Sequence, residues 1–323
     1  MLSGAWAPAS AAGYASDPDV DAFIRDMVRH HAFTEEHLRA LFTGAERQER
    51  VLDVIQRPAE AKPWHEYRPI FLTPRRIREG ARFWRTHEGL LQEVARAYGV
   101  DPAIVVAILG IETYYGKRTG SFPVFSTLTT LGFEYPPRDD FFRRELEQFL
   151  LLTREEGMDP LGPEGSYAGA MGKGQFIPSS YRHYAVDFDG DGRRDLWDST
   201  ADAVASIANY LSEHGWRRGE PVTVPAKLRD QAPDSLLERG YKPSVPVSEL
   251  EDDGVVAEAP VDGGRQAGLI ELEGETGSEH WLVFHNFYVI TRYNHSPLYA
   301  MAVYQLARAI KDARGSTEHA VTP

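Results

Sequence analysis

The sequence predicts a mainly helical α+β protein with an accessory helical subdomain, a small β-rich insertion and one calcium loop of the EF-hand type. Three observations lead to this fold class. Apolar residues recur at helical spacing over most of the chain. The composition changes to Pro, Gly and short β-prone runs over residues 217–284. Residues 187–198 have the aspartate spacing of an EF-hand loop. A length of 323 residues suits one large domain with subdomains, or two domains.

The first helices are expected between Asp17 and Gln56, where "VDAFIRDMVRHH", "TEEHLRALF" and "RQERVLDVI" have amphipathic periodicity, with Thr34 as an N-cap. We expect residues 17–62 to form a helical subdomain together with a C-terminal helix over 297–314. Residues 1–16 are rich in small residues and are expected to be a disordered leader or the remnant of a signal peptide. Residues 315–323 are expected to be a loose tail.

A helical core is expected over residues 63–216, and residues 285–299 return to it after the β-rich insertion 217–284. Thr73 and Pro74 have the residue types of an N-cap and a first helical position. A second helix starts at Asp101-Pro102 and is apolar on every side from Ala103 to Ile111, which is typical of a helix buried in a core.

Glu112 follows this apolar helix. Desolvation favours the neutral form of a carboxyl group, and this prepares a general acid to protonate a leaving group. The alternative is a structural glutamate paired with an arginine or a backbone amide.

The segment "VDFDGDGRRDLWD" places oxygen ligands where an EF-hand loop needs them. The ligand positions are filled in order by Asp187, Asp189, Asp191, the backbone carbonyl of Arg193, Asp195 and Asp198, with Gly192 at the sharp turn. Asp198 is one methylene shorter than the usual glutamate, so Asp202 is an alternative closing ligand. The other interpretation is an acidic turn that binds nothing. A long chain with only 5 Met, and no second such loop, favours a structural ion over a calcium sensor.

Composition excludes several function classes. Lys+Arg 35 against Asp+Glu 48 gives a net charge of -13, which argues against a general nucleic-acid surface. The absence of cysteine excludes disulfides, thiol catalysis and cysteine-type zinc sites. No apolar run has the length of a transmembrane helix.

Two further segments have the composition of a sugar-binding groove. "GSYAGAMGKGQFIPSS" combines closely spaced glycines with Ser166, Met171, Gln175 and Phe176, which suits a backbone that approaches a ligand. "NFYVITRYNHSPLYAMAV" supplies aromatic rings with polar tips, and Asn294 beside them. An ordinary glycine-rich loop and an aromatic core element are the alternatives.

Together these segments resemble one family, the membrane-bound lytic murein transglycosylase B enzymes, which cleave bacterial peptidoglycan. The resemblance is carried by "PWHEYRPIFLTP", "AILGIETYYGKRTG", "GSYAGAMGKGQFIPSSYRHYAVDFDGDGRRDLWD", "ASIANYLSEHGW" and "NFYVITRYNHSPLYAMAVYQLA". It covers most of residues 63–310, but not the β-rich insertion in detail. It implies a lysozyme-like core with one structural Ca²⁺, in the periplasm or cell envelope of a bacterium. Many members are anchored through an N-terminal cysteine, and because this sequence has none, membrane anchoring is not supported.

The resemblance also implies the roles of individual residues. Glu112 would be the only catalytic acid and base, and Met171 and Phe176 would pack beneath the sugars. The groove would be lined by Tyr67, Ser166, Gln175, Asn209, Tyr210, Tyr293, Asn294 and Tyr299. The calcium ligands would be Asp187, Asp189, Asp191, the Arg193 carbonyl and Asp202, with Asp195 and Asp198 as alternatives.

The implied reaction cleaves the β-1,4 bond between N-acetylmuramic acid and N-acetylglucosamine in peptidoglycan strands and forms 1,6-anhydromuramoyl ends. Proteins of cell-wall synthesis or hydrolysis are the implied partners. Two alternatives stay open at this point. One is a muramidase that hydrolyses the same bond, and the other is a non-catalytic, calcium-dependent glycan-binding protein.

Overall fold

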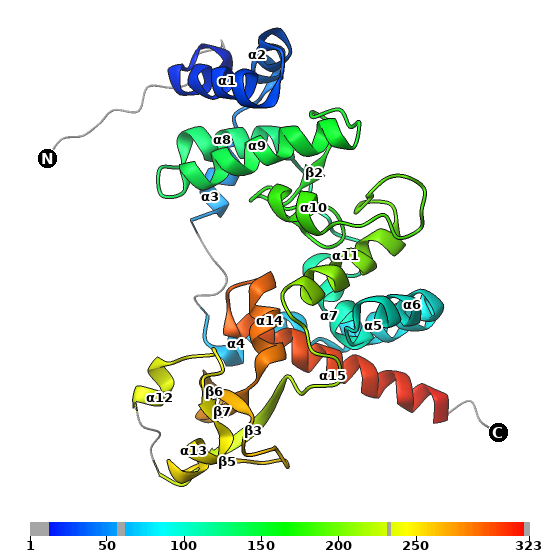
Figure 1. Ribbon diagram of the computed structural model, residues 1–323, viewed down its shortest axis with the longest axis vertical. Helices are drawn as coiled ribbons and strands as arrows, with labels where there is room; N and C mark the ends of the chain where they lie inside the picture. The colour runs from blue at the N-terminus through cyan, green and yellow to red at the C-terminus, as the bar shows by residue number, and fades with distance from the viewer. Residues whose placement is uncertain (1–12, 57–61, 231–233, 320–323) are drawn as a thin grey trace, which may run out of the picture. The chain divides into compact units, whose positions relative to one another are not determined.

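The computed structural model describes residues 13–56, 62–230 and 234–319, which form two compact units (Figure 1). Of these residues, 13–56 and 119–183 belong to unit 1, and 62–118 and 184–319 belong to unit 2. The chain therefore passes between the units three times. This division differs from the expected one, because it splits the predicted core 63–216 and assigns the C-terminal helix to unit 2.

Unit 1 is helical with a two-stranded ribbon. Its elements are the 3-10 helix η1 (Tyr14–Ser16), α1 (Pro18–His31), α2 (Glu35–Gly44), α3 (Glu49–Val54), β1 (Phe122–Pro123), α8 (Val124–Glu134), α9 (Asp139–Glu155), β2 (Glu164–Gly165) and α10 (Pro178–Tyr184), which ends at the boundary. Helices α8 and α9 pack against each other, and α1 packs on α2. Thr34 is the N-cap of α2, as expected, and its hydroxyl accepts a hydrogen bond from the His37 amide at 3.3 Å.

The packing of unit 1 begins earlier in the chain than expected. Tyr14 is buried, and its hydroxyl donates to Glu134 Oε1 at 2.5 Å and lies within hydrogen-bonding distance of the Thr130 hydroxyl, at 3.1 Å. The prediction of a disordered leader over residues 1–16 is therefore wrong for residues 14–16, since an aromatic ring with a bonded hydroxyl anchors them. Residues 1–12 lie outside the described part of the chain.

Unit 2 combines a helical bundle with a five-stranded sheet. Its helices are α4 (Trp64–Phe71), α5 (Pro74–Thr86), α6 (Glu88–Tyr98), α7 (Pro102–Thr113), α11 (Thr200–Glu213), α12 (Asp234–Glu238), α13 (Val247–Asp252), α14 (His285–Tyr293) and α15 (Pro297–His319). Its strands are β3 (Thr223–Leu228), β4 (Val245–Pro246), β5 (Val255–Ala257), β6 (Gln266–Glu273) and β7 (Ser278–Val283).

Helix α7 lies at the centre of the bundle, in contact with α5, α6, α11 and α15. Residues 103–110 are all buried, which confirms the expected core helix. Asp101 caps its start by accepting a hydrogen bond from the Ala103 amide at 2.9 Å, and Pro102 occupies the first turn. Helix α15 contacts α4, α5, α7 and α14, which all belong to unit 2.

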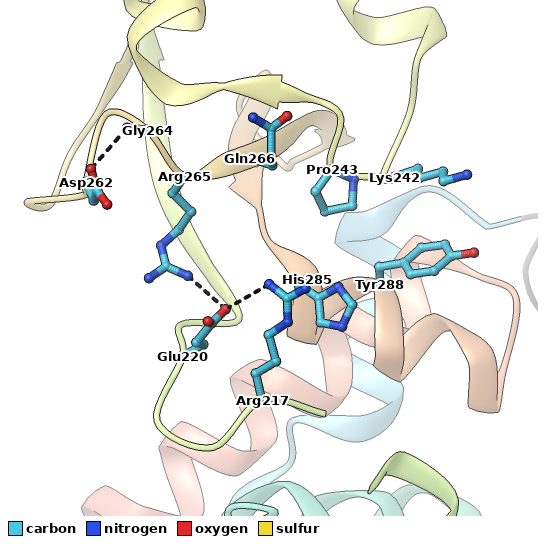
Figure 2. Close-up of a pocket in the computed structure, with 10 residues that line it drawn as sticks. All are labelled: Arg217, Glu220, Lys242, Pro243, Asp262, Gly264, Arg265, Gln266, His285 and Tyr288. Carbon is cyan, nitrogen blue, oxygen red and sulfur yellow. Dashed lines mark hydrogen bonds and ion pairs between the residues drawn. The ribbon is translucent and has the colours of Figure 1, made fainter. Parts of the chain in front are cut away.

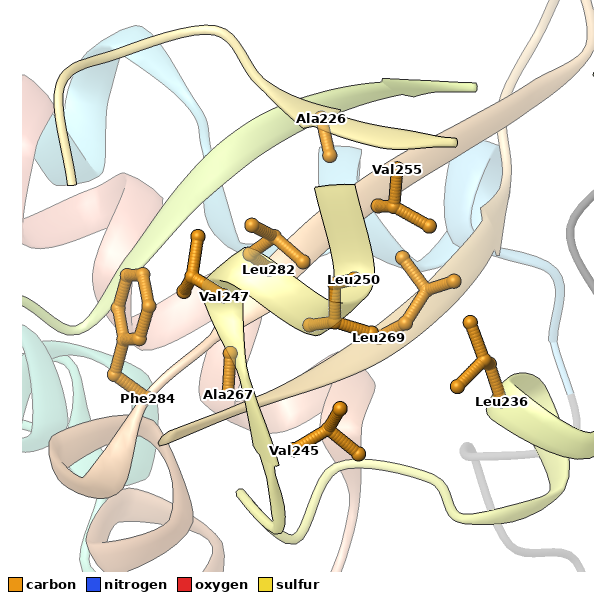
Figure 3. Close-up of a cluster of buried hydrophobic side chains, with 10 residues drawn as sticks. All are labelled: Ala226, Leu236, Val245, Val247, Leu250, Val255, Ala267, Leu269, Leu282 and Phe284. Atoms are coloured by element: carbon orange, nitrogen blue, oxygen red, sulfur yellow. The ribbon is translucent and has the colours of Figure 1, made fainter. Parts of the chain in front are cut away.

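The β-rich insertion is an antiparallel sheet with strand order β4-β6-β7-β3-β5. Helix α13 packs on it, and Figure 3 shows Val247 and Leu250 of this helix among the apolar side chains of the strands. Because Leu269 and Leu282 on adjacent strands are also buried there, the insertion has a hydrophobic cluster of its own. The expected strand-rich segment is confirmed.

Helix α15 continues to His319, so the predicted loose tail from residue 315 starts too early, and residues 320–323 lie outside the described part. No single helix among the described residues is long and apolar enough to cross a membrane. The pair α6 and α7 reaches the required composition together, but the two helices are bent by 112°.

Gly110 in α7 allows the ring of Tyr115 to pack closely against the helix, and this contact can be tested. A Cβ atom on Gly110 would lie 2.7 Å from the ring of Tyr115, so Gly110→Ala should lower the free energy of unfolding by about 1–3 kcal/mol. Gly89 in α6 has nothing within 4 Å of that position, and Gly89→Ala should be neutral or stabilise by up to about 1 kcal/mol. The free energy of unfolding of both variants, measured by urea denaturation, tests this prediction. Equal effects of the two substitutions would contradict the close packing at Gly110.

Candidate functional site

Glu112 lies in the last turn of α7, directly before a strained turn. Tyr114, Tyr115 and Gly116 have φ values of 54°, 63° and 80°, and left-handed backbone costs a non-glycine residue about 1–2 kcal/mol. The turn is held by Thr113, whose hydroxyl accepts from the Gly116 amide at 2.9 Å, and by the Tyr115 amide, which donates to the Leu109 carbonyl at 3.1 Å. Such strain persists where the surrounding structure enforces it, and it is concentrated at functional sites.

The side chain of Glu112 is hydrogen-bonded to a buried tyrosine. The hydroxyl of Tyr299, near the start of α15, donates to Glu112 Oε1 at 2.5 Å. Burial, and then the nearby Glu112 carboxylate, raises the pKa of Tyr299 well above its ordinary value, and the same two causes raise the pKa of Tyr293. Both phenols therefore stay protonated at neutral pH, and this keeps Tyr299 a hydrogen-bond donor to the carboxylate.

Tyr67 and Tyr210 belong to the same group of aromatic side chains in unit 2. Tyr67 is 2% exposed and lies near enough to Tyr299 to contribute to its raised pKa. The rings of Tyr210 and Tyr293 are 4.9 Å apart in an edge-on arrangement. The structure thus brings together Glu112 and the four predicted tyrosines Tyr67, Tyr210, Tyr293 and Tyr299.

The polar groups of Asn209 and Tyr210 hold backbone in place. The Tyr210 hydroxyl donates to the Arg292 carbonyl at 2.5 Å, and burial raises the pKa of Tyr210 to about 12. Asn209 Nδ2 donates to the Tyr184 carbonyl at 2.9 Å. Asn294 is the C-cap of α14. The Tyr210 bond fixes the end of the helix that carries Tyr293.

Two residues of this site were not identified from the sequence. Thr113 holds the turn after Glu112, and Tyr115 lies across Gly110 with its hydroxyl bonded to the Arg76 carbonyl at 2.7 Å. The run "TYYG" contains the signal, since a glycine shortly after an apolar helix is typical of a helix end.

The four predicted residues of the glycine-rich loop belong to unit 1, whereas Glu112 belongs to unit 2. Met171 and Phe176 are buried and exchange two backbone hydrogen bonds of 2.9 and 3.0 Å. Gln175 has a φ of 52°, and its amide nitrogen donates to the carbonyls of Thr119 and Gly172. Ser166 Oγ accepts from two backbone amides.

The glycines of this loop are required by close backbone packing. A Cβ atom on Gly120 would lie 2.0 Å from the Gly165 carbonyl oxygen, and one on Gly165 would lie 2.3 Å from that of Ala170. Gly120 also has a φ of 98°. The segment is therefore a tightly packed turn that contains Ser166 and Gln175, and its role as a sugar-binding segment stays a prediction.

The acidic loop brings three carboxylates close together. Asp187, Asp189 and Asp202 each offer an oxygen, and these atoms lie within 4.8 Å of one another. Asp187 accepts hydrogen bonds from the amides of Gly190 and Gly192, which wraps the backbone around it. Like charges at this separation repel unless a proton or a cation lies between them, and hard oxygen ligands suit calcium.

Asp202 joins the two ends of the acidic loop. It is fully buried at the start of α11, and its carboxylate accepts from the amides of Phe188 and Asp195 at 2.8 Å each. Burial raises the pKa of Asp202. Asp195, in contrast, accepts from the amides of Trp197 and Asp198 within a local turn. This arrangement favours Asp202 over Asp198, which is exposed and outside the group of three.

Comparison with known proteins matches residues 15–308 to the family described as "Transglycosylase SLT domain". The membrane-bound lytic murein transglycosylase B of Escherichia coli (strain K12) is 43% identical over 311 residues, which cover 93% of this chain and 85% of that protein.

Two solved structures show the same fold. The soluble lytic transglycosylase SltB1 of Pseudomonas aeruginosa matches with a TM-score of 0.87 and 48% identity, over 92% of this chain and 100% of that chain. The Escherichia coli lytic transglycosylase Slt35, solved in complex with calcium, matches with a TM-score of 0.86 and 43% identity, over 93% of this chain and 95% of that chain. With a family model that spans residues 15–308 and relatives of this identity, the chain belongs to the SLT-domain transglycosylase family.

Proposed function

We propose that this protein is a lytic transglycosylase that cleaves the β-1,4 bond between N-acetylmuramic acid and N-acetylglucosamine in peptidoglycan. The observation that carries this proposal is the single carboxyl group of Glu112, held at a strained helix end by the buried hydroxyl of Tyr299. The names of the relatives support the reaction class and the murein substrate.

In the proposed mechanism Glu112 acts first as an acid and then as a base. The protonated carboxyl group gives its proton to the glycosidic oxygen, while positive charge develops at the anomeric carbon. The carboxylate then takes the proton of the muramoyl 6-hydroxyl, which attacks the same anomeric carbon and closes the 1,6-anhydro ring. The internal nucleophile competes well with water because its effective molarity is high.

A single carboxyl group suits this reaction, because the substrate supplies the nucleophile. Ordinary glycosidases need a second carboxylate for a water molecule or a covalent bond. Glu79 is a carboxylate near the end of α7, but Lys117 Nζ lies 2.6 Å from its Oε2 and lowers its pKa. Glu79 therefore suits an ion pair and not proton transfer.

The tyrosines around Glu112 are proposed as the sugar contacts of unit 2, and Ser166 and Gln175 as those of unit 1. Tyr67, Tyr293 and Tyr299 combine flat rings with hydroxyl groups, which is what a sugar ring requires. Tyr210 and Asn209 are assigned a positioning role, since their polar groups bind backbone. Met171 and Phe176 support the loop from beneath.

We further propose that Asp187, Asp189 and Asp202 hold one structural Ca²⁺, with Asp191 and the Arg193 carbonyl as further ligands. The convergence of three carboxylates and the calcium complex of Slt35 support this ion. A bound cation would offset the repulsion within the group and so stabilise the loop. The family and its substrate suggest the bacterial cell envelope, or periplasm, as the site of action. Proteins of cell-wall synthesis or hydrolysis are the proposed partners.

The first prediction concerns the acid and base. Glu112→Gln should lower kcat on purified sacculi by about 10²- to 10⁴-fold, because an amide of the same shape cannot donate and recover a proton. Circular dichroism and the melting temperature should stay close to those of the native protein. Glu93→Gln, an exposed carboxylate on α6, is the matched control and should keep full activity. Wild-type turnover by Glu112→Gln would refute the assignment.

The second prediction separates the transglycosylase from a muramidase. Muropeptides released in heavy-oxygen water should end in 1,6-anhydromuramic residues that carry no solvent oxygen, because the 6-hydroxyl is the nucleophile. Mass spectrometry of the new ends gives the answer. Reducing ends labelled by solvent would show that the enzyme is a muramidase.

The third prediction concerns calcium. An ion that binds only the native state at about 100 times its Kd adds about 2.7 kcal/mol to the free energy of unfolding. The melting temperature of the native protein should therefore rise with calcium and fall with chelator. The melting temperature of Asp202→Asn should not respond to either. Asp198→Asn, outside the group of three, should still respond. A native protein indifferent to calcium would mean that the loop is only a turn.

A further inference from the structure

A second cavity lies in unit 2 and shares no residue with the Glu112 group. It has a volume of about 550 Å³ and lies beside the start of α14, next to the segments that precede β3, β4 and β6 (Figure 2). His285 and Tyr288 of α14 line it, together with Arg217, Glu220, Lys242 and Arg265 from these segments. Charged and hydrogen-bonding groups thus converge on a space large enough for part of a ligand.

The charges of this cavity are not balanced. Arg265 Nη1 and Arg217 Nη1 both lie near Glu220 Oε2, at 2.9 and 3.6 Å, so two guanidinium groups share one carboxylate. Lys242 has no ion pair within the described part of the chain, and Asp262 is the other acidic residue of the lining. The lining therefore contains three cations and two anions, on a chain whose net charge is -13. A surplus of one positive charge suits one carboxylate better than a doubly charged phosphate.

The backbone that carries Arg217, Glu220 and Arg265 is held in place by the fold. Asn286 on α14 is fully buried, and its side chain accepts from the Arg217 amide at 2.9 Å. The same side chain donates to the carbonyls of Arg217 and Glu220 at 2.8 and 3.0 Å. Arg265 follows a turn in which its own amide donates to the Asp262 carbonyl at 3.0 Å. A buried amide that fixes the loop beneath two charged side chains is the support that a preorganised site requires.

The neutral groups of the cavity complement a peptide. His285 Nε2 bonds to the Gly215 carbonyl at 2.8 Å, and since a carbonyl only accepts, the neutral ring keeps Nδ1 as an acceptor. Tyr288, partly exposed, adds a ring and a hydroxyl group. An acceptor beside guanidinium donors fits the N–H groups and the terminal carboxylate of a short peptide.

We propose that this cavity binds the C-terminal carboxylate of the peptide stem that each muramoyl residue of peptidoglycan carries. This inference rests on the proposed function, since it names the part of the murein that the second cavity recognises. Helix α14 connects the two sites, because Tyr293 at its end belongs to the Glu112 group. The helix rises about 12 Å from His285 to Tyr293. An extended peptide of four residues spans about 13 Å, so a stem can reach from a muramoyl ring to the cavity.

The test is a titration that involves no turnover. A synthetic stem pentapeptide, free of sugar, is titrated calorimetrically into the native protein, alongside the same peptide with a C-terminal amide. The acid should bind about tenfold or more tightly than the amide, because a charge-assisted hydrogen bond is lost with the carboxylate. Arg265→Gln and Lys242→Gln should each weaken binding of the acid by about tenfold. Lys227→Gln, which removes a cation from β3 outside the cavity, should not.

The outcomes are distinguishable. Equal binding of acid and amide, an unchanged Kd for Arg265→Gln, or inorganic phosphate that binds more tightly than the peptide would each overturn the proposal. Melting temperatures establish that the variants are folded. A failure to form anhydro ends would refute the proposed reaction, but it would leave this titration unaffected. With sacculi fragments, the variants should raise KM for peptide-bearing strands relative to KM for strands stripped of peptide.

Discussion

The carboxyl group of Glu112 depends on a helix that is buried on every side and on the strained turn that ends it. Helix α7 has no exposed face, so the bundle of α5, α6, α11 and α15 determines where Glu112 lies. Because Tyr114 and Tyr115 both adopt left-handed backbone, the chain turns away sharply and leaves the glutamate at the helix end. Tyr299 then restricts the carboxylate from α15, a segment 187 residues later in the chain.

The acidic loop stabilises the same bundle from another side. Asp202 lies in the first turn of α11 and bonds the backbone on both sides of the loop. About two turns further along the same helix, Asn209 and Tyr210 bind backbone, and Tyr210 holds the end of α14. Tyr293 therefore lies at the end of a chain of contacts that begins at the loop. The proposed Ca²⁺ would stabilise this scaffold, and the proposed chemistry does not require it as a participant.

Sequence patterns predicted the structural elements that are determined by residues close together in the sequence. The apolar run before Glu112 and the N-cap at Thr34 are local patterns, and the structure confirms the elements they predict. The aspartate spacing is also local, and the structure brings Asp187, Asp189 and Asp202 together, but calcium binding stays a prediction. Features that depend on distant contacts were missed or incorrect. Tyr14 is anchored by Thr130 and Glu134 of α8, which no local pattern indicates. The position of α15 in unit 2 depends on its contacts with α5 and α7, more than 180 residues earlier.

Side-chain direction was the other limit of the sequence. The family resemblance suggested Asn209 and Tyr210 as sugar contacts, and this stays a prediction. Their polar groups bond to the backbone carbonyls of Tyr184 and Arg292, a direction that no sequence pattern indicates. The spacing of the ligands likewise left open whether Asp198 or Asp202 is the closing calcium ligand, because position along a loop does not indicate which carboxylate points inward. In the structure Asp202 is buried within the group of three carboxylates and Asp198 is exposed, so Asp202 is the proposed closing ligand.

The most direct test of the central claim is a double-mutant cycle between Glu112 and Tyr299, measured as turnover of purified sacculi with product detection by mass spectrometry. If Tyr299 acts by positioning the Glu112 carboxyl group, Tyr299→Phe should lower turnover about tenfold in the native background. The same substitution should have almost no further effect on the residual turnover of Glu112→Gln, since residues that act as a unit are not additive. An equal loss in both backgrounds would show that Tyr299 acts independently of Glu112 and would contradict this account.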